Sequence, residues 1–385
     1  MNWKFGVMAL AASMSFFTAC SDDDDDDDDD RGGTIVTDNT VLKGSITSDV
    51  TLKAGNNYKL SGEYIVEEGA TLNIEAGVKI VAVYDDIVDY ILVKQGAKIN
   101  AIGTSDAPIV MTSEKEEPGA WGGIHICGRA HTNAEGGKGS SEIGGAQYGG
   151  TVDNDNSGII KYVRVEYTGY AFDEEHEANG ITFYGVGNGT TVENCQAYKG
   201  SDDGFEFFGG TVNVNNLVAV NCSDDSFDWT EGWNGHGTNL LAYQETETTL
   251  GYDCDCLIEA DNNENNYSAT PVSHPVLSNL LLVGNGGSKQ GMRLRRGTQV
   301  DVNDAIICGK SKPLCVESSE TEIALKEGNS TLSNIILNAS LNSEKGIYTN
   351  NDFTASGNSV DNSIQYGTLE AAKEACTWIT GSWVK

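Results

Sequence analysis

Residues 192–207 read VENCQAYKGSDDGFEF, and residues 214–229 read VNNLVAVNCSDDSFDW. The two lines match position by position at a constant offset of 22 residues. Self-similarity at a fixed period of this size indicates stacked units, because no single unit can bury its apolar face alone. Each unit contains two short β-type runs separated by Ser-Asp-Asp. The repeat therefore predicts a solenoid of stacked turns.

Within each unit, apolar and acidic residues alternate. Phe205 and Phe207 flank Glu206, and the equivalent run one unit later, residues 227–229, reads Phe-Asp-Trp. Alternation at period 2 places the aromatic side chains on one face of a strand and the carboxylates on the other. We therefore expect an all-β fold, a right-handed, single-stranded parallel β-helix. The aromatic side chains, such as Phe205 and Phe227, should stack inside it and the acids outside.

The same pattern extends over residues 34–385, which we expect to form one β-helix domain. Residues 65–74 match residues 92–101 at an offset of 27, and the strand pattern returns at 277–284, 302–309 and 332–338. Residues 368–376 have helical spacing and precede two tryptophans. An open solenoid end needs cover from water and from edge pairing, so we expect a small C-terminal helical cap from about residue 367 over the last turn.

Residues 129–158 are rich in glycine and serine and show no periodicity. A loop of this length inside a compact domain is usually functional or mobile.

The amino-terminal residues have the features of an export signal. An apolar run at residues 5–17 follows Lys4 and is too short to span a bilayer as a permanent helix. Cys20 follows small residues and resembles the lipobox cysteine of bacterial lipoproteins. This resemblance implies a signal peptide at residues 1–19, cleavage before Cys20, and acylation that anchors Cys20 in a membrane. Plain secretory cleavage without lipid is the alternative.

Ser21 and nine aspartates follow Cys20 directly. A run of like charges repels itself and extends, so residues 20–33 are expected to be the lipidated cysteine and a solvated tether. Ser-Asp-Asp-Asp after the cysteine also resembles the export signal of surface lipoproteins in the Bacteroidetes. That resemblance implies a location on the outer membrane facing the cell exterior, with the periplasm as the alternative.

The net charge disfavours one class of partner. The chain carries a formal charge of −33, and nine of these charges lie in the aspartate run, which leaves −24 on the other residues. An acidic body repels phosphate backbones, so the composition disfavours nucleic-acid binding.

Aligning the second strand of successive units predicts one outward row of charged residues. Neighbouring turns lie about 4.8 Å apart, so carboxylates stacked in this way repel each other unless a cation intervenes. The oxygen ligands fit Ca²⁺. The alternative is that the aspartate pairs cap turns by accepting backbone N–H bonds, with Arg293 and water satisfying the row. The row comprises Glu206, Asp228, Glu259 and Arg293, and a second acidic set at the preceding turn comprises Asp202, Asp203, Asp224 and Asp225.

Aromatic side chains near these acids suggest a sugar-binding surface. Trp233 lies in the Gly-rich run 231–237, between Glu231 and Asn234. Aromatic faces beside carboxylates and amides bind sugars, because sugar CH groups stack on the ring and hydroxyls bond the oxygens. We therefore expect Trp233, Glu231, Asn234 and Arg293 to bind ligand. The alternative is that Trp233 folds back over the strands.

Catalysis is a further possibility that the sequence leaves open. A polysaccharide lyase needs a base, typically Arg or Lys, beside bound Ca²⁺, and Arg293 and Arg295 stand close to the acidic row. The acids repeat with the turns, which is more simply architectural, and no His, Ser or Cys triad stands out. The sequence therefore favours a non-catalytic protein, with a Ca²⁺-dependent lyase as the alternative.

Eight cysteines follow Cys20. Export permits disulfides and the even number permits full pairing, with Cys308 and Cys315 as one pair that could meet across a turn. Buried free thiols are the alternative.

Residues 201–210, 224–233 and 258–266 read SDDGFEFFGG, DDSFDWTEGW and IEADNNENN. They are similar to recurring motifs of the largely uncharacterised, pectin-lyase-like β-helix surface lipoproteins of the Bacteroidetes. Such lipoproteins often lie beside TonB-dependent outer-membrane importers. The resemblance implies a surface protein that binds extracellular glycan for an importer. A lyase and an adhesin or structural surface protein are the alternatives.

Overall fold

The computed structural model describes residues 33–85, 87–172 and 177–385, and residues 33–385 form one compact unit. The predicted signal peptide, Cys20 and the aspartate run lie outside the described residues. Within the described residues, no helix is both long and apolar enough to cross a membrane.

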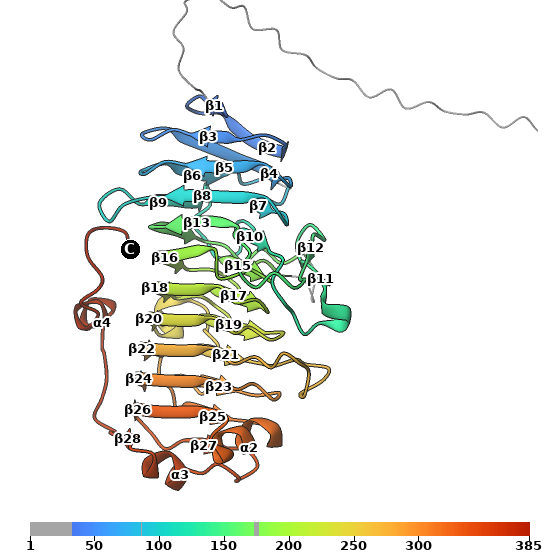
Figure 1. Cartoon of the computed structure of the whole chain (residues 1–385). Helices are drawn as coiled ribbons and strands as arrows, with labels where there is room; N and C mark the ends of the chain where they lie inside the picture. Colours follow the sequence, from blue (N-terminus) through green and yellow to red (C-terminus); the bar gives the residue numbers. More distant parts are fainter. Residues whose placement is uncertain (1–32, 86, 173–176) are drawn as a thin grey trace, which may run out of the picture. The chain divides into compact units, whose positions relative to one another are not determined.

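The compact unit is a right-handed parallel β-helix, as the repeat predicts. Of the strands in the described residues, 26 join in one hydrogen-bonded network, and every pairing within it is parallel between successive turns (Figure 1). The strands form three faces. The first face begins with β1 (Thr34–Val36), β3 (Val50–Leu52), β5 (Thr71–Ile74), β8 (Lys98–Ile102) and β13 (Gly158–Lys161). The second begins with the first halves of β2 (Val41–Ile46) and β4 (Asn57–Val66) and continues with β6 (Lys79–Ala82), β9 (Ile109–Ser113) and β14 (Val163–Glu166).

From residue 191 onward, long bent strands contribute to both the first and the second face. These are β16 (Thr191–Tyr198), β18 (Asn213–Val220), β20 (His236–Tyr243), β22 (Val276–Val283), β24 (Asp301–Cys308) and β26 (Thr331–Leu337), and β28 (Ser359–Val360) extends the second face. The third face begins with the second halves of β2 (Val41–Ile46) and β4 (Asn57–Val66). It continues with β7 (Tyr90–Val93), β10 (Ile124–Cys127), β15 (Ile181–Tyr184), β17 (Phe205–Phe208), β19 (Phe227–Thr230), β21 (Ile258–Ala260), β23 (Gln290–Leu294), β25 (Lys312–Val316) and β27 (Asn342–Ser343).

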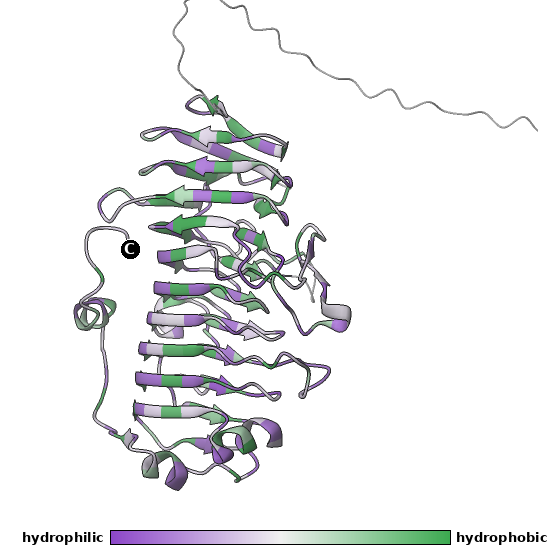
Figure 2. Ribbon diagram, viewed as in Figure 1, coloured by the Kyte–Doolittle hydropathy of each residue, from purple (hydrophilic) through white to green (hydrophobic). Residues whose placement is uncertain are grey.

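The aromatic residues of the repeat stack inside the helix, which confirms the predicted register. Phe205 pairs with Phe227, and their ring centroids are 5.6 Å apart and nearly parallel. Phe183 stacks in the same way on Phe207 at 5.1 Å. Apolar and polar residues alternate along the strands, as Figure 2 shows. The alternation places one continuous apolar core inside the turns.

An asparagine ladder that the sequence reasoning missed fixes the bend between the first and second faces. Asn194, Asn216, Asn239 and Asn279 all have φ near +60°, a left-handed conformation that asparagine tolerates. The side-chain amides of the last three each donate to the side-chain oxygen of the asparagine one turn earlier, at distances of 2.5–2.8 Å. Asp304 and Asn334 occupy the equivalent positions in the next two long strands and also have positive φ. The signal was present in the sequence, because these residues recur at the same place in every long strand.

The C-terminal helix forms, but its predicted place over the last turn is wrong. Helices α2 (Ser319–Glu327) and α3 (Asn350–Ala355) cover that end, where Leu325 and Phe353 join the main core. Helix α4 (Leu369–Ala375) instead lies along the outside of the second face (Figure 1). There Trp383 packs in one apolar cluster with Val220 and Leu241.

The reason is that the second face is apolar on both sides. The runs at residues 217–220, 240–243 and 280–283 contain almost no polar residue, and a strand of that kind must be buried on both faces. The C-terminal segment supplies this cover. It ends with the Ser382 N–H donating to the Ser105 carbonyl at 2.7 Å and with Lys385 Nζ 3.1 Å from Glu166.

The eight cysteines of the described residues are all free and buried. The predicted alternative of free thiols is therefore the one the structure has, and Cys308 and Cys315 form no disulfide.

Candidate functional site

The predicted row of charged residues is present on the third face. Glu206 pairs with Asp228, Asp228 with Glu259, and Glu259 with Arg293, on strands β17, β19, β21 and β23. Parallel strands in register place these side chains about 4.8 Å apart. The repeat in the sequence was sufficient to predict this alignment.

These acids lie on the outer side of the strands, as predicted, but most of them are buried there. Glu206 is 9% exposed, Asp203 6% and Asp225 4%. The loop of residues 129–158, with hairpin strands β11 (Gly139–Ser140) and β12 (Gln147–Tyr148) and a short 3₁₀ turn at Glu135–Gly137, lies over the outer side of the third face. The alternation of apolar and acidic residues correctly predicted the side of the strand on which the acids lie. It could not show that another part of the chain covers that side.

Aromatic contacts hold this loop in place. Tyr184 and Phe208, outward residues on neighbouring turns, stack with centroids 4.7 Å apart, and Tyr148 of the loop packs on Tyr184 at 5.1 Å. The Tyr148 hydroxyl donates to Glu231 at 2.8 Å, and the Tyr184 hydroxyl donates to Glu142 of the loop at 3.0 Å. The loop thus brings a further carboxylate, Glu142, against the acidic row.

The second aspartate of each pair caps a turn, which is one of the two predicted roles. Asp203 Oδ1 accepts the backbone N–H of Asp225 at 2.9 Å, and Asp225 Oδ1 accepts the N–H of Cys256 at 2.6 Å. Each carboxylate therefore links its own turn to the next. Capping uses one oxygen of each group and does not by itself exclude a shared cation.

Burial strongly perturbs the acids of the central turns. It raises the pKa of Glu206 and of Asp228 well above their ordinary values, and neighbouring carboxylates raise them further. Asp202, Asp203 and Asp225 behave in the same way, and the pKa of Asp224 rises to about 6. Each shift indicates that a negative charge in this cluster lacks full compensation.

The oxygens of this cluster lie close enough to share a cation. Carboxylate oxygens of Asp203, Glu206 and Asp228 lie within 4.8 Å of one another, and those of Asp225, Asp228 and Glu259 form a second such group. Asp228 Oδ1 is buried and has no hydrogen-bond partner. An all-oxygen donor set with an unpartnered oxygen fits a hard cation such as Ca²⁺.

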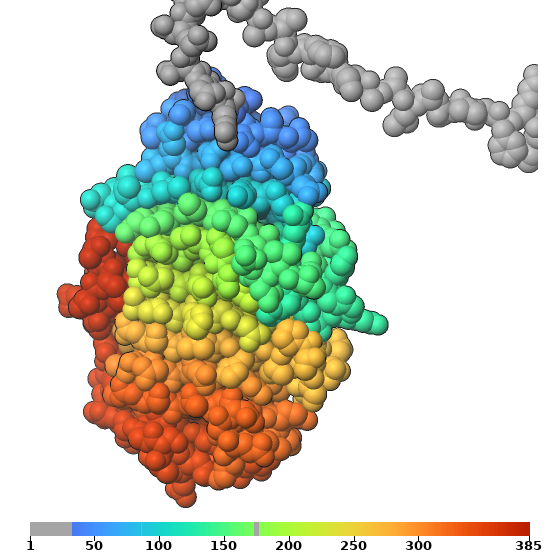
Figure 3. Space-filling model, in the orientation of Figure 1, coloured from blue at the N-terminus to red at the C-terminus, as the bar shows by residue number. Residues whose placement is uncertain are grey.

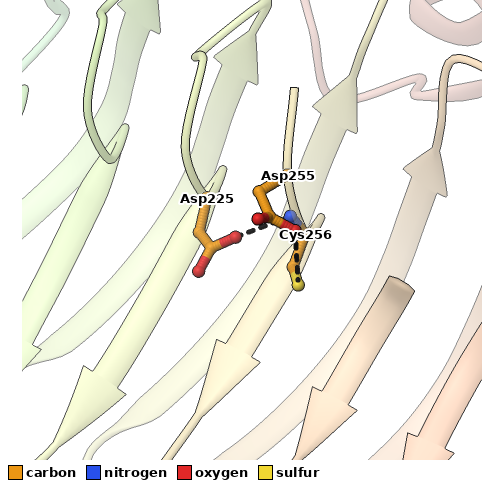
Figure 4. Close-up of side chains that lie close together, drawn as sticks. All are labelled: Asp225, Asp255 and Cys256. Atoms are coloured by element: carbon orange, nitrogen blue, oxygen red, sulfur yellow. Dashed lines mark hydrogen bonds between the residues drawn. The ribbon is translucent and has the colours of Figure 1, made fainter. Parts of the chain in front are cut away.

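A third close group, Asp225, Asp255 and Cys256, does not fit a metal (Figure 4). Asp255 already pairs with Lys289 at 2.6 Å, and Cys256 donates its N–H to Asp225. Burial raises the pKa of the Cys256 thiol, so the thiol is protonated when no metal is bound. Hydrogen bonding accounts for this group.

The structure corrects the predicted sugar-binding residues. Trp233 is 1% exposed, stacks on Phe207 with centroids 4.1 Å apart, and donates its Nε1–H to the Val212 carbonyl. Its ring faces are covered, so it cannot stack on a sugar. Asn234 donates to the carbonyls of Gly232 and Val272 and thereby fixes neighbouring loops. A Gly-rich loop does not guarantee exposure, because glycines also let a ring fold back into the core.

Glu231 has a mixed position. Its carboxylate accepts hydrogen bonds from Thr132 and Tyr148, which tie it to the loop of residues 129–158. It nevertheless lines the cavity described below.

The arginines of the row are engaged by carboxylates. Arg293 lies between Glu259 at 2.9 Å and Glu317 at 3.0 Å. Arg295 pairs with Glu259 and, at 2.7 Å, with Asp261. Burial alone would lower the pKa of both arginines, but these partners outweigh it and raise it. A base must give up its proton, so these ion pairs argue against Arg293 or Arg295 as a lyase base.

A cavity of about 390 Å³ opens on the third face beside the acidic row. It lies between the loop of residues 129–158 and the insertion of residues 262–275, which Figure 3 shows on the same side of the molecule. Asn133 joins these two segments by donating to Asn262 Oδ1 at 2.8 Å and by accepting from Asn263 at 3.0 Å. The lining residues are Glu142, Glu206, Phe208, Asp228, Thr230, Glu231, Asp261, Asn263, Glu264, Asn265, Arg295 and Arg296.

Sequence reasoning missed several of these lining residues, including Glu142, Asp261 and Glu264. A signal existed for the last two, because the insertion of residues 262–275 begins directly after the strand that carries Glu259. Glu142 had none, since the loop that carries it has no periodicity.

A comparison with protein-family models agrees with this architecture. No curated protein matches the sequence. A similar solved structure is the A-module of the mannuronan C-5 epimerase AlgE6 of Azotobacter vinelandii, with 11% sequence identity, a TM-score of 0.28, and coverage of 77% of this chain and 79% of that chain. At that identity and TM-score the match supports no functional conclusion. The family model described as a pectate-lyase-like β-helix domain matches residues 44–384, and the chain therefore belongs to that family.

Proposed function

We propose that this protein is a lipid-anchored cell-surface protein that binds extracellular polysaccharide in the cavity on the third face, together with a divalent cation such as Ca²⁺. The observation that carries the proposal is the position of Glu206 and Asp228. Both line the cavity, and burial raises the pKa of both. Carboxylates on the exposed surface would carry no such desolvation cost. The presence of buried carboxylates at this cavity therefore suggests a ligand that compensates their charge.

The chemistry of the cavity suggests an acidic glycan. Ca²⁺ takes six to eight oxygen ligands, and the carboxylates of the row supply only part of that number. Hydroxyl and carboxylate oxygens of a uronate-containing chain could complete the coordination. Arg296, with 31% of its side chain exposed, lies at the same cavity and could pair with a sugar carboxylate.

The location rests on the amino-terminal sequence. The lipobox-like Cys20, the aspartate run and the family resemblance support an anchor in the outer membrane that faces the exterior. A protein held there would present bound polymer to a TonB-dependent importer. This role needs no catalysis, and the ion pairs of Arg293 and Arg295 disfavour the lyase alternative.

Retention on immobilised polysaccharides tests the proposal. The panel includes polyuronates and neutral glycans, each with excess Ca²⁺ and with chelator. We expect retention on a polyuronate that requires Ca²⁺ and that Asp228→Asn abolishes. Glu75→Gln, which alters an exposed carboxylate paired with Lys53 away from the cavity, is the matched control and should leave retention unchanged.

Three outcomes would count against the proposal in different ways. Ultraviolet-absorbing unsaturated products would replace binding with lyase chemistry. Retention that does not depend on Ca²⁺ and is unchanged by Asp228→Asn would show that the binding site lies elsewhere. Absence of retention on every polysaccharide would leave an adhesin or structural role.

A further inference from the structure

Lys310 is a buried lysine whose surroundings the acidic site does not explain. Lys310 lies on the turn that follows β24 and is 1% exposed. Nζ donates to the carbonyl oxygen of Cys254 at 3.0 Å and to Asn285 Oδ1 at 2.9 Å. Both partners are neutral. A buried ammonium group held only by neutral partners is costly, because neither partner supplies the opposite charge that would compensate it.

The stacking of the turns places Asn285 directly beside Lys310. Val283 pairs with Cys308 at the ends of β22 and β24, so Asn285 and Lys310 each lie two residues beyond that pair. A β-carbon on Gly284 would lie 2.5 Å from Lys310 Cγ. Glycine at 284 therefore lets the lysine side chain lie flat across the preceding turn and reach the asparagine.

The Asn285 side chain is held at both ends of its amide. The backbone N–H of Gly287 donates to Oδ1 at 3.0 Å, beside the contact from Lys310. Nδ2 donates to Asp253 Oδ1 at 2.9 Å. An N–H donor on the carbonyl oxygen polarises the carbonyl carbon, and a carboxylate next to the nitrogen can carry a proton to it.

We propose that Lys310 and Asn285 form an intramolecular amide bond, with Asp253 as the proton carrier. The amine of Lys310 attacks Asn285 Cγ, and the carbonyl electron pair moves onto Oδ1, where the Gly287 N–H stabilises it. Asp253 takes a proton from the attacking nitrogen and passes it to Nδ2. The Cγ–Nδ2 bond then breaks and ammonia leaves. An amine and a primary amide become a secondary amide and ammonia, so the step needs no oxidant or reductant.

The environment favours this reaction in two ways. Burial lowers the pKa of Lys310, against the opposing effect of nearby acidic groups, and so increases the share of the neutral, nucleophilic amine. The product amide also removes a buried charge. The bond would tie two successive turns together at the edge of the stack.

Peptide mapping of the full chain tests the proposal directly. Protein incubated at neutral pH is unfolded, digested and analysed by mass spectrometry. We expect the peptide that contains Asn285 joined to the peptide that contains Lys310, at the summed mass less about 17 Da, the mass of the ammonia released. Lys310→Arg keeps the charge but should abolish the joined peptide. Lys312→Arg, which changes an exposed lysine on β25, is the matched control and should retain it.

A competing reaction sets the decisive criterion. Asn285 precedes Gly286, and attack of the Gly286 nitrogen on Asn285 would also release ammonia, but it would leave the two peptides separate. Loss of about 17 Da from the Asn285 peptide alone, or two unmodified linear peptides, would overturn the proposal. Asp253→Ala should slow the joining, and an unchanged rate would exclude Asp253 as the proton carrier.

Discussion

The third face carries two acidic regions that differ in how their charge is compensated. In the C-terminal turns, Arg293, Arg295 and Arg296 form ion pairs with Glu259 and Asp261, and Arg293 and Arg295 partly offset the rise that burial causes in the pKa of Glu259. In the central turns, Asp203, Glu206 and Asp228 form no ion pair within the part of the chain that the structure describes, although Arg295 acts on Asp228 from a distance. The same row of stacked positions thus changes from compensated to uncompensated within one turn. Successive turns of a repeat can thus share the same geometry and still differ in how their charges are compensated. The uncompensated part of the row borders the cavity.

Removing an arginine from the C-terminal acidic region should have the largest effect on the stability of the fold. Arg295→Met leaves Asp261 and Glu259 buried with fewer partners, and loss of one partner of a buried pair costs about 3–5 kcal/mol. We expect a clear fall in the thermal-unfolding midpoint at pH 7. An unchanged midpoint would mean that the C-terminal region is no better compensated than the central one.

The pH should act mainly on the central region. Asp224 has a folded pKa of about 6 and an ordinary value near 4, so between these values the folded state binds more protons than the unfolded state. The stability that this group contributes is therefore complete below pH 4 and is lost as the pH rises through about 6, by about 3 kcal/mol. Burial raises the pKa of Asp89 to about 7, which acts in the same direction.

Thermal melts from pH 5 to pH 8 in chelator should show this decline. Excess Ca²⁺ should reduce the part of the decline that comes from the central carboxylates, because a ligand that binds only the folded state stabilises that state, and should leave the part from Asp89. A midpoint that rises with pH in chelator would show that the central carboxylates are compensated after all.

These two regions also show how far sequence reasoning can reach. Periodicity predicted the vertical alignment of Glu206, Asp228 and Glu259, because register follows from a constant offset. It could not predict their burial, which depends on a loop that has no repeat of its own. It also misplaced Trp233, since local glycines are compatible with both an exposed and a folded-back ring. Long-range cover by Tyr148 and by the C-terminal segment is a tertiary property that no local pattern encodes.

Removing one acid from the central region should have a smaller effect of opposite sign. Asp228→Asn keeps the size of the side chain and removes one of several buried like charges. We expect a gain of about 1 kcal/mol in chelator at pH 7, together with loss of the Ca²⁺-dependent shift in the unfolding midpoint. Destabilisation in chelator would instead indicate that the Asp228 carboxylate has a structural role.

The smallest effect on stability is expected for an ion pair that also joins neighbouring turns but lies at the surface. Lys94 Nζ lies 2.8 Å from Glu67, one turn away, and their side chains are 36% and 30% exposed. Water screens such a pair, so Lys94→Gln should change stability by less than about 1 kcal/mol, and less still at high salt. Arg295 and Lys94 thus contrast two ion pairs of the same stacking geometry. Because burial is the main difference between them, comparable losses from the two substitutions in urea unfolding would show that the electrostatic contrast along this β-helix does not arise from burial.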